Sequence, residues 1–274
     1  MGAYRLEVHA TPLGSPFGDG SKEYPTRTLN GALSIVRRLR RNNQPVVIWL
    51  HEGDYELKDP LELSSDCDGV TFAAWREGDH VDHVRITGAQ ALDQWSEDSI
   101  NGRRIWVSRV DAHAGRTLYV HGSRMSRPRV PHKGYLRITE QENLDVHADL
   151  NATLFNGASK FSFDPDDVKD LASIHAWPGM EAVIPHFWIQ ERLPIASIDM
   201  EQGIVCSDYQ TMLCLKDGDG DQLARFYFDG VAEALGQYDH EWLLDSEGVL
   251  STDAKPNGYG NSVVLFVPAE DESL

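Results

Sequence analysis

The chain has few cysteines, and their arrangement excludes two common uses of this residue. Cys67, Cys206 and Cys214 are the three cysteines among 274 residues, and no two of them form a Cys-x-x-Cys motif. A disulfide framework needs paired cysteines and an oxidising compartment, so none is expected. The first residues also lack the apolar core of a signal peptide. We therefore expect a cytoplasmic protein, or a secreted one if a signal peptide has been removed.

Positive charge is scarce as well. Lys plus Arg number 25 against 43 for Asp plus Glu, which gives a formal net charge of -18. Binding to nucleic acid or to an anionic membrane needs clustered cationic side chains, so neither partner is expected. One basic cluster stands out, and it is interpreted as a solvated helix end because no aromatic residues are interleaved with it. Its members are Arg37, Arg38, Arg40 and Arg41.

Long apolar runs and the common catalytic motifs are missing too. No stretch approaches the roughly 18 consecutive apolar residues that span a bilayer. His80 and His83 do not form a His-Glu-x-x-His motif, and there is no Gly-x-Ser-x-Gly, Walker or Gly-x-Gly-x-x-Gly sequence. An uncharged ligand suits this acidic chain better than a polyanion, although an acidic surface also serves solubility alone.

One acidic segment partly matches the calcium-loop template. Asp217, Asp219 and Asp221 match its first, third and fifth positions. The template then requires Gly at its sixth position and a bidentate Glu at its twelfth, where this chain has Gln222 and Phe228. The segment is therefore interpreted as the acidic tip of a hairpin, and we expect neither a metal nor a cofactor.

Short apolar runs between turn residues are abundant. Such runs of Val, Ile, Leu and Phe predict β-strands. Their spacing is too short for helical crossovers, and the first of them is apolar throughout, as in a strand covered on both faces. The pattern predicts the opening coils of a β-solenoid in which each strand stacks on the next. Between residues 45 and 88 the runs lie at Val46–Leu50, Tyr55–Leu57, Leu61–Leu63, Val70–Trp75 and Val84–Thr87.

A helix is predicted immediately before these strands. Thr28 is a suitable N-cap, and the apolar residues that follow it recur with the spacing of one helix face. The arginine cluster lies at the C-terminal end, where cations complement the helix dipole. Such a helix can cover the end of a solenoid, whose strand edges would otherwise be unpaired. The apolar residues are Leu29, Ala32, Leu33, Val36 and Leu39.

The sequence resembles the N-terminal region of bacterial right-handed parallel β-helix proteins that include carbohydrate-active enzymes, chiefly glycoside hydrolases. Four segments carry the resemblance, and together they span most of the chain in order. They are Phe17–Leu57, Arg116–Val130, Glu181–Asp199 and Arg225–Leu250. In that family the long run of β-helix coils and the catalytic carboxylates lie further toward the C-terminus than Leu274.

The resemblance implies a mainly β fold, with the start of a right-handed parallel β-helix capped by an N-terminal helix and an inserted, largely antiparallel β domain of sandwich-like type. The expected boundaries are residues 1–115 for the helix-capped coils, 116–245 for the insert and 246–274 for a truncated return toward the β-helix. The remaining coils, or a second copy of the chain, are expected protein partners.

The resemblance also implies a carbohydrate partner. The chain is interpreted as the accessory, N-terminal part of a glycoside hydrolase that acts on plant or microbial polysaccharides or oligosaccharides. By itself it is expected to be inactive, and no catalytic residue is assigned. Two alternatives stay open, namely a glycan-binding module without catalysis and a capping or folding module without a ligand.

Two arginines are candidate ligands for substrate. In the resemblance, the segment Arg116–Val130 is the most characteristic one, with a strand and turn followed by spaced arginines. The planar forks of Arg127 and Arg129 could hydrogen-bond sugar hydroxyls or carboxylates. The alternative is that these side chains tie the insert to the β-helix through backbone carbonyls and acidic partners.

The run Glu181–Ile189 supplies two further candidates. It is interpreted as a strand on which His186 and Trp188 share one face and Phe187 lies on the other. A Trp ring can stack on the apolar face of a sugar, and a neighbouring His can donate to its hydroxyls. The alternative is that Trp188 fills the core of the insert. Phe187 departs from the pattern that the resemblance leads one to expect here.

Glu241 and Asp245 invite comparison with the carboxylate pair of a glycosidase. On a strand, residues four apart share a face but lie about 13 Å apart along it. Glycosidase carboxyl groups are about 5 to 9.5 Å apart. This pair is therefore not assigned a catalytic role.

Overall fold

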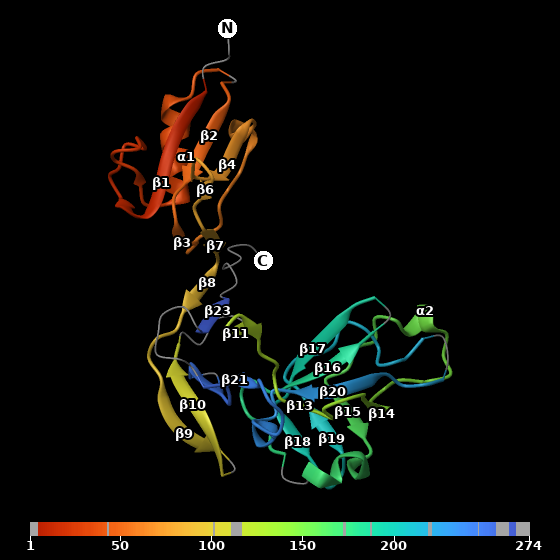
Figure 1. Ribbon diagram of the computed structural model, residues 1–274. Helices are drawn as coiled ribbons and strands as arrows, with labels where there is room; N and C mark the ends of the chain where they lie inside the picture. Colours follow the sequence, from red (N-terminus) through yellow and green to blue (C-terminus); the bar gives the residue numbers. More distant parts are fainter. Residues whose placement is uncertain are drawn as a thin grey trace. The chain divides into compact units, whose positions relative to one another are not determined.

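Figure 1 shows the computed structural model of the chain. The structure describes residues 5–42, 44–100, 102–110, 117–171, 174–186, 188–218, 221–245, 247–255 and 263–266. The chain divides into two compact units, which we call unit 1 (Met1–Gln90 with Phe266–Leu274) and unit 2 (Ala91–Leu265). Strands dominate both units, which confirms the expectation of a mainly β protein. The expected boundaries at residues 115 and 245 stay predictions.

Most strands of unit 1 belong to two parallel stacks. The strands of this unit are β1 (Leu6–Ser15), β2 (Val46–Leu50), β3 (Gly53–Glu56), β4 (Val70–Ala74), β5 (Arg76–Glu77), β6 (His80–Val81) and β7 (Val84–Thr87), and β8 (Ala89–Ala91) follows them. β5 and β6 form a separate antiparallel pair. β1, β2 and β4 pair in this order, so that Ala10, Leu50 and Ala74 lie side by side. β3 pairs with β7, with Tyr55 opposite Ile86. The chain therefore alternates between the two stacks: β2 and β4 belong to the first stack, and β3 and β7, which follow them in the sequence, belong to the second.

Four of the five runs predicted between residues 45 and 88 are strands. Val46–Leu50 and Val84–Thr87 match their strands at both ends. The prediction of a strand at Leu61–Leu63 is wrong, because this segment has no partner strand and runs into the short 3-10 turn η1 (Ser65–Cys67). Pro60 before it cannot donate to a strand ladder, and Leu63 is 58% exposed.

The predicted helix is α1 (Leu29–Leu39). Thr28 caps it, since its Oγ1 accepts a hydrogen bond from the Gly31 N–H at 3.0 Å. The apolar face of α1 is buried with Val8 and Ile48 in the hydrophobic core of unit 1. Most of the stability of this helix therefore comes from packing rather than from its intrinsic propensity. No helix in the described ranges has the length and apolar character needed to cross a membrane.

Unit 2 is built on a large antiparallel sheet with the strand order β17-β16-β20-β14-β15-β19-β18, and β13 pairs with β20. This confirms the expectation of largely antiparallel strands in this part of the chain. The strands are β13 (Arg129–Val130), β14 (Leu136–Gln141), β15 (Lys160–Phe163), β16 (Glu181–Pro185), β17 (Gln190–Pro194), β18 (Ser197–Asp199), β19 (Ile204–Cys206) and β20 (Arg225–Asp229). Asp217 and Gln222 form the base of the predicted hairpin, and Asp219 at its tip lies outside the described residues.

Smaller elements complete unit 2. A second antiparallel sheet has the order β21-β22-β10-β9, and β11 pairs with β12 beside β23. These strands are β9 (Ser96–Ile100), β10 (Arg103–Arg109), β11 (Thr117–Val120), β12 (Ser123–Arg124), β21 (Trp242–Leu244), β22 (Val249–Thr252) and β23 (Val263–Phe266). The helical segments are α2 (Leu150–Thr153), η2 (Pro165–Leu171) and η3 (Ala232–Ala234).

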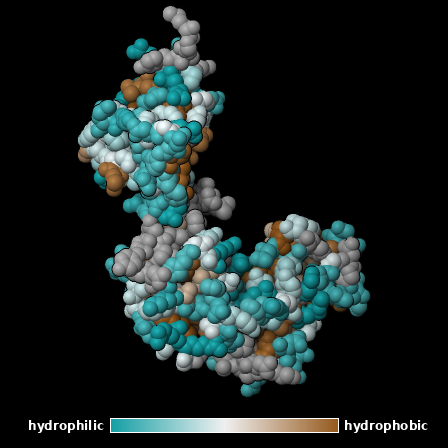
Figure 2. Space-filling view, viewed as in Figure 1, coloured by the Kyte–Doolittle hydropathy of each residue, from teal (hydrophilic) through white to brown (hydrophobic). Residues whose placement is uncertain are grey.

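A cluster of phenylalanines forms the core of unit 2 against one face of the large sheet. Phe226 is fully buried, and its ring meets those of Phe161, Phe163 and Phe228 edge to face at centroid distances of 5.0 to 5.8 Å. This arrangement suits the quadrupoles of the rings. Outward-facing residues of the same strands are polar, and Figure 2 shows a mostly hydrophilic surface over the visible face of the unit. The polar face of this sheet carries the predicted arginines.

Candidate functional site

Four charged side chains meet on the polar face of the large sheet, three from strands β16, β17 and β20 and one from the segment before β13, and we call them the arginine–carboxylate network. They are Arg127, Glu181, Arg192 and Asp229. Asp229 Oδ2 accepts hydrogen bonds from Arg127 Nε at 2.9 Å and from Arg192 Nη1 at 2.8 Å. Arg192 Nη1 also donates to Glu181 Oε2 at 2.8 Å. The carboxylate side chains are 7% and 8% exposed, so these are largely desolvated ion pairs.

The sheet register explains this network. Glu181 lies directly opposite Asp229 in the β16–β20 pair, and two like charges in this position repel. Arg192 relieves the repulsion because it binds both carboxylates through one nitrogen. Their bound oxygens are therefore no more than twice 2.8 Å apart, and both contact the guanidinium of Arg192.

The two predicted arginines bind backbone carbonyls, an acidic residue and a ring, and all of these partners lie within unit 2 rather than in the β-helix coils. Arg127 Nη2 donates to the Gly179 carbonyl at 2.7 Å, in addition to its bond with Asp229. Arg129 donates from Nε to the Pro131 carbonyl at 3.0 Å, and its guanidinium carbon lies 3.6 Å from the centre of the Tyr227 ring. The guanidinium groups of both arginines therefore already have partners within unit 2. A role for Arg127 and Arg129 in sugar binding stays a prediction.

The segment with His186 and Trp188 is a turn, so the prediction of a strand up to Ile189 is wrong. β16 ends at Pro185 and β17 begins at Gln190, and the His186 N–H closes the turn by donating to the Ile189 carbonyl at 2.8 Å. His186 and Trp188 consequently do not share one face. The His186 side chain is fully buried, whereas Trp188 is 70% exposed. Phe187 lies outside the described residues.

The buried His186 holds this turn in place. Its Nε2 lies 2.7 Å from Glu191 Oε2, and the Glu191 carboxylate also accepts the Met212 N–H at 2.6 Å. Burial lowers the pKa of His186, and the carboxylate beside it opposes this shift. His186 is a positioning residue for the hairpin rather than an accessible sugar ligand.

The exposure of Trp188 overturns the alternative that it fills the core. Trp188 lies in the β16–β17 turn, whereas the two predicted arginines lie next to Asp229, which pairs with Glu181 at the other end of β16. The four intervening residue steps correspond to about 13 Å of strand. The structure therefore does not bring the four predicted binding residues into one site. Of the four, Trp188 has the most exposed side chain.

Glu241 and Asp245, which the sequence leaves without a catalytic role, both have structural partners. Glu241 is 3% exposed, and its Oε2 accepts the Gly236 N–H at 2.8 Å. Burial raises the pKa of Glu241, because the desolvated carboxylate is less favourable than the acid. Asp245 Oδ1 accepts the Val249 N–H at 2.8 Å and so closes the turn before β22.

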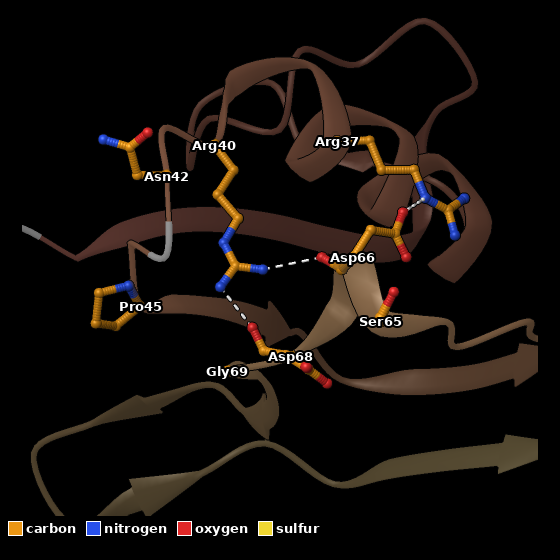
Figure 3. Close-up of a pocket in the computed structure, with 8 residues that line it drawn as sticks. All are labelled: Arg37, Arg40, Asn42, Pro45, Ser65, Asp66, Asp68 and Gly69. Atoms are coloured by element: carbon orange, nitrogen blue, oxygen red, sulfur yellow. Dashed lines mark hydrogen bonds and ion pairs between the residues drawn. The ribbon is translucent and has the colours of Figure 1, made fainter.

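The arginines at the end of α1 line a cavity of about 710 Å³ in unit 1, shown in Figure 3. Arg40 donates to the Gln44 and Asp66 carbonyls, each at 2.9 Å, and Arg37 Nε donates to Asp66 Oδ2 at 2.6 Å. The interpretation as a solvated helix end is therefore incomplete, since these two side chains tie the helix to the loop before β4. Residues so far apart in the sequence give no local signal of this contact.

Sequence reasoning also missed a chain of polar rings in unit 1. His9 Nδ1 lies 3.1 Å from His51 Nε2, and His51 Nδ1 lies 3.5 Å from Asp82 Oδ2. If the proton on His51 Nδ1 faces Asp82, its Nε2 must accept from His9 Nδ1–H. Both imidazole rings pack against Trp75, at centroid distances of 5.1 and 5.4 Å.

Unit 1 should lose stability as the pH falls below about 6.5. The pKa of His9 is lowered by burial and then by His51, so the unfolded chain takes up this proton at a higher pH than the folded chain. Between these two pKa values the free energy of unfolding rises with pH. His9→Gln should flatten this part of the stability profile in thermal melts from about pH 5 to 8. His80→Gln, at a ring that is 69% exposed, is the control. A profile unchanged by His9→Gln would contradict the role of His9.

The comparisons with known proteins concern the fold. No family model matches the chain, and no curated protein matches it. A solved structure described as "Glycoside hydrolase" matches 96% of this chain with a TM-score of 0.67 and 18% identity. A second, described as "The complex structure of XylC with xylose", covers 91% of this chain and 32% of its own with a TM-score of 0.32 and 16% identity.

The first of these likenesses defines the class of fold. At this TM-score the chain has a β-rich fold like that of a glycoside hydrolase structure, which confirms the predicted resemblance at the level of the fold. The chain spans 46% of the length of that structure. The second likeness, with its low TM-score, carries no argument.

Proposed function

We propose that this chain is the accessory, N-terminal part of a β-helix glycoside hydrolase, and that its own role is to bind carbohydrate. The observation that carries this proposal is the likeness to a glycoside hydrolase structure, which covers nearly all of this chain but less than half of that protein. In a protein of this kind the catalytic carboxylates would lie in further coils. Plant or microbial polysaccharides or oligosaccharides are the proposed ligands.

The stacked strands of unit 1 support the proposal of a right-handed parallel β-helix. β4 and β7 end their stacks in the described part of the chain, each paired on one side only. All of β4 is partly or fully exposed, whereas four of the five residues of β2 are buried. An open, half-apolar strand edge is a template for another strand. The next coil of a longer chain would cover β4 and β7. A structure of such a chain that leaves both edges unpaired would contradict this proposal.

The same edge favours a second candidate function. A module that only caps and nucleates the following coils would also present a partly exposed last rung. It would need no ligand, so glycan binding separates it from the first proposal.

Trp188 is the proposed sugar contact. Its ring is exposed at the tip of a hairpin that the His186–Glu191 contact holds in place. A large exposed ring on a fixed turn binds without a large loss of conformational freedom. Sugar rings present apolar C–H faces that pack on such a surface, and the acidic chain as a whole favours neutral ligands.

Trp188→Ala should weaken the binding of neutral plant or bacterial polysaccharides by about tenfold or more. Removal of one stacked aromatic ring typically reduces the free energy of binding by between about 1 and a few kcal/mol. About 1.4 kcal/mol corresponds to a tenfold change in the dissociation constant. Affinity gel electrophoresis with xylan, arabinan, galactan and related polysaccharides measures the change.

Phe155→Ala is the matched control, because Phe155 is an aromatic residue of unit 2 with 71% exposure. It should leave binding unchanged. Glycan binding that survives Trp188→Ala would contradict the proposed contact. Failure of the unmodified chain to bind any polysaccharide would favour the capping module.

A further inference from the structure

A second cavity, which none of the predicted residues lines, lies within unit 2. Its volume is about 390 Å³, within the range of about 300 to 1,000 Å³ that is typical of ligand pockets. Three separate segments form it, namely the β11–β12 turn, the loop before β21 and the segment after β22. The polar residues that line it are His121, Ser123, Asp239, His240, Asp253 and Lys255. We call it the histidine cavity.

Both histidines of this cavity have a backbone conformation that suits glycine better. The φ angle is 51° at His121 and 68° at His240. In the left-handed region an L side chain crowds its own backbone, so a residue without Cβ would be more stable at either position. Strained residues of this kind cluster at functional sites. Two imidazoles are thus held at one cavity against the local preference of the chain.

Some of the lining groups are fixed by the fold. Asp253 accepts hydrogen bonds from the N–H groups of His240 at 3.0 Å and Glu241 at 2.8 Å. His121 Nε2 lies 3.0 Å from the Lys255 carbonyl, which can only accept, so this nitrogen carries the proton. In neutral His121 the other ring nitrogen, Nδ1, is therefore an acceptor. Burial raises the pKa of Asp253, which agrees with a partly desolvated cavity wall.

Other lining groups are available to a ligand. Within the described residues, the side chains of Ser123, Asp239 and His240 make no hydrogen bond or ion pair to each other or to the rest of the chain. They provide a hydroxyl that can donate and accept, a carboxylate that accepts, and an imidazole that can donate or accept a hydrogen bond. The cavity therefore offers both donors and acceptors at its surface.

The chemistry of the cavity narrows the class of ligand. The Ser123 hydroxyl is not hydrogen-bonded to His240, so the pair lacks the contact that activates a serine nucleophile. No group of three or more metal-ligating side chains in the described ranges is arranged to hold a metal ion. Asp239 and Asp253 oppose an anionic ligand, and Lys255 partly balances their charge. A neutral molecule with several hydroxyl groups can use both the donors and the acceptors.

We propose that the histidine cavity binds a neutral monosaccharide unit, with Asp239, His240 and Ser123 as its hydrogen-bonding groups. This inference rests on the proposed role in carbohydrate binding and adds a site separate from Trp188. The cavity holds one sugar by hydrogen bonds, whereas the exposed indole offers only a stacking surface. The ligand is the free sugar or the terminal unit of a glycan.

The test measures binding of single sugars by the full chain with two variants that spare the fold. His240→Gly removes the imidazole and relieves the left-handed backbone, and Asp239→Asn keeps the shape of an exposed side chain. Chemical-shift or saturation-transfer NMR against xylose, arabinose, fucose and galactose gives the affinity. Each variant should weaken binding by about tenfold, as expected for a lost hydrogen bond to a charged or polar group.

Two control variants distinguish binding in this cavity from a change in backbone strain and from binding at Trp188. Asn143 also has a left-handed backbone conformation, with φ of 61°, but it does not line the cavity. Asn143→Gly therefore relieves the same kind of backbone strain and should leave binding unchanged. Trp188→Ala should also leave the binding of single sugars unchanged, even where it weakens the binding of polysaccharides. Unchanged affinity in both cavity variants overturns the proposal, and so does the absence of binding by any of these sugars at millimolar concentration. Loss of polysaccharide binding in Trp188→Ala alone would support the proposed function while overturning this further site.

Discussion

Asp229→Ala should lower the free energy of unfolding of unit 2 by about 3 kcal/mol, as for other broken buried ion pairs. The carboxylate is 7% exposed and accepts hydrogen bonds from both Arg127 and Arg192. Without it the Arg127 fork keeps only the Gly179 carbonyl, and Arg192 keeps only Glu181. The loss comes mainly from positive charge that stays partly buried without its partner, since the Arg127 and Arg192 side chains are 16% and 34% exposed.

The chain offers a close control for this experiment. Asp217 also lies between two arginines of the same unit, at 3.2 Å from Arg225 Nε and 3.6 Å from Arg137 Nη1, but its side chain is 30% exposed. Asp217→Ala should therefore cost less than about 1 kcal/mol, because water screens exposed pairs. Urea denaturation followed by tryptophan fluorescence compares the two variants. Equal losses at Asp217 and Asp229 would show that burial is not what gives the network its strength.

Phe226→Ala should destabilise unit 2 by about 3 to 5 kcal/mol, the usual cost of truncating a buried aromatic residue. Phe226 has no exposed surface, and its ring contacts three other phenylalanine rings of the core. The cavity left behind would be lined by rings on strands whose positions are fixed by the sheet, so it can collapse only in part. Thermal and urea unfolding would show the loss in the transition of unit 2.

Phe155→Ala provides the reference, since that ring is 71% exposed. Surface substitutions of this kind usually change stability by no more than about 0.5 kcal/mol. The same variant is the control for glycan binding, so its folding and its binding can be measured on one sample. A small loss in Phe226→Ala would mean that the phenylalanine cluster can repack around the missing ring.

The positions of the predicted binding residues show where sequence reasoning stops. Trp188 could be recognised as a candidate from its residue type, but whether it lay inside or outside depended on the end of β16 at Pro185. After that strand end, alternation no longer applies, and the side chain of His186 is buried whereas that of Trp188 is exposed. The histidine cavity had no sequence signal at all, because its residues come from three turns that only the sheets bring together.

The sequence by itself determined the local elements of this protein. The apolar runs placed most strands between residues 45 and 88, Thr28 and the spacing after it placed α1, and the charge balance argued against a nucleic-acid surface. These features depend on neighbours within a few residues, which the sequence displays directly. Tertiary structure alone decided which side chains meet. The Arg127–Asp229 contact joins residues 102 positions apart, and it forms because the pairing of β13 with β20 brings the segment just before β13 beside Asp229.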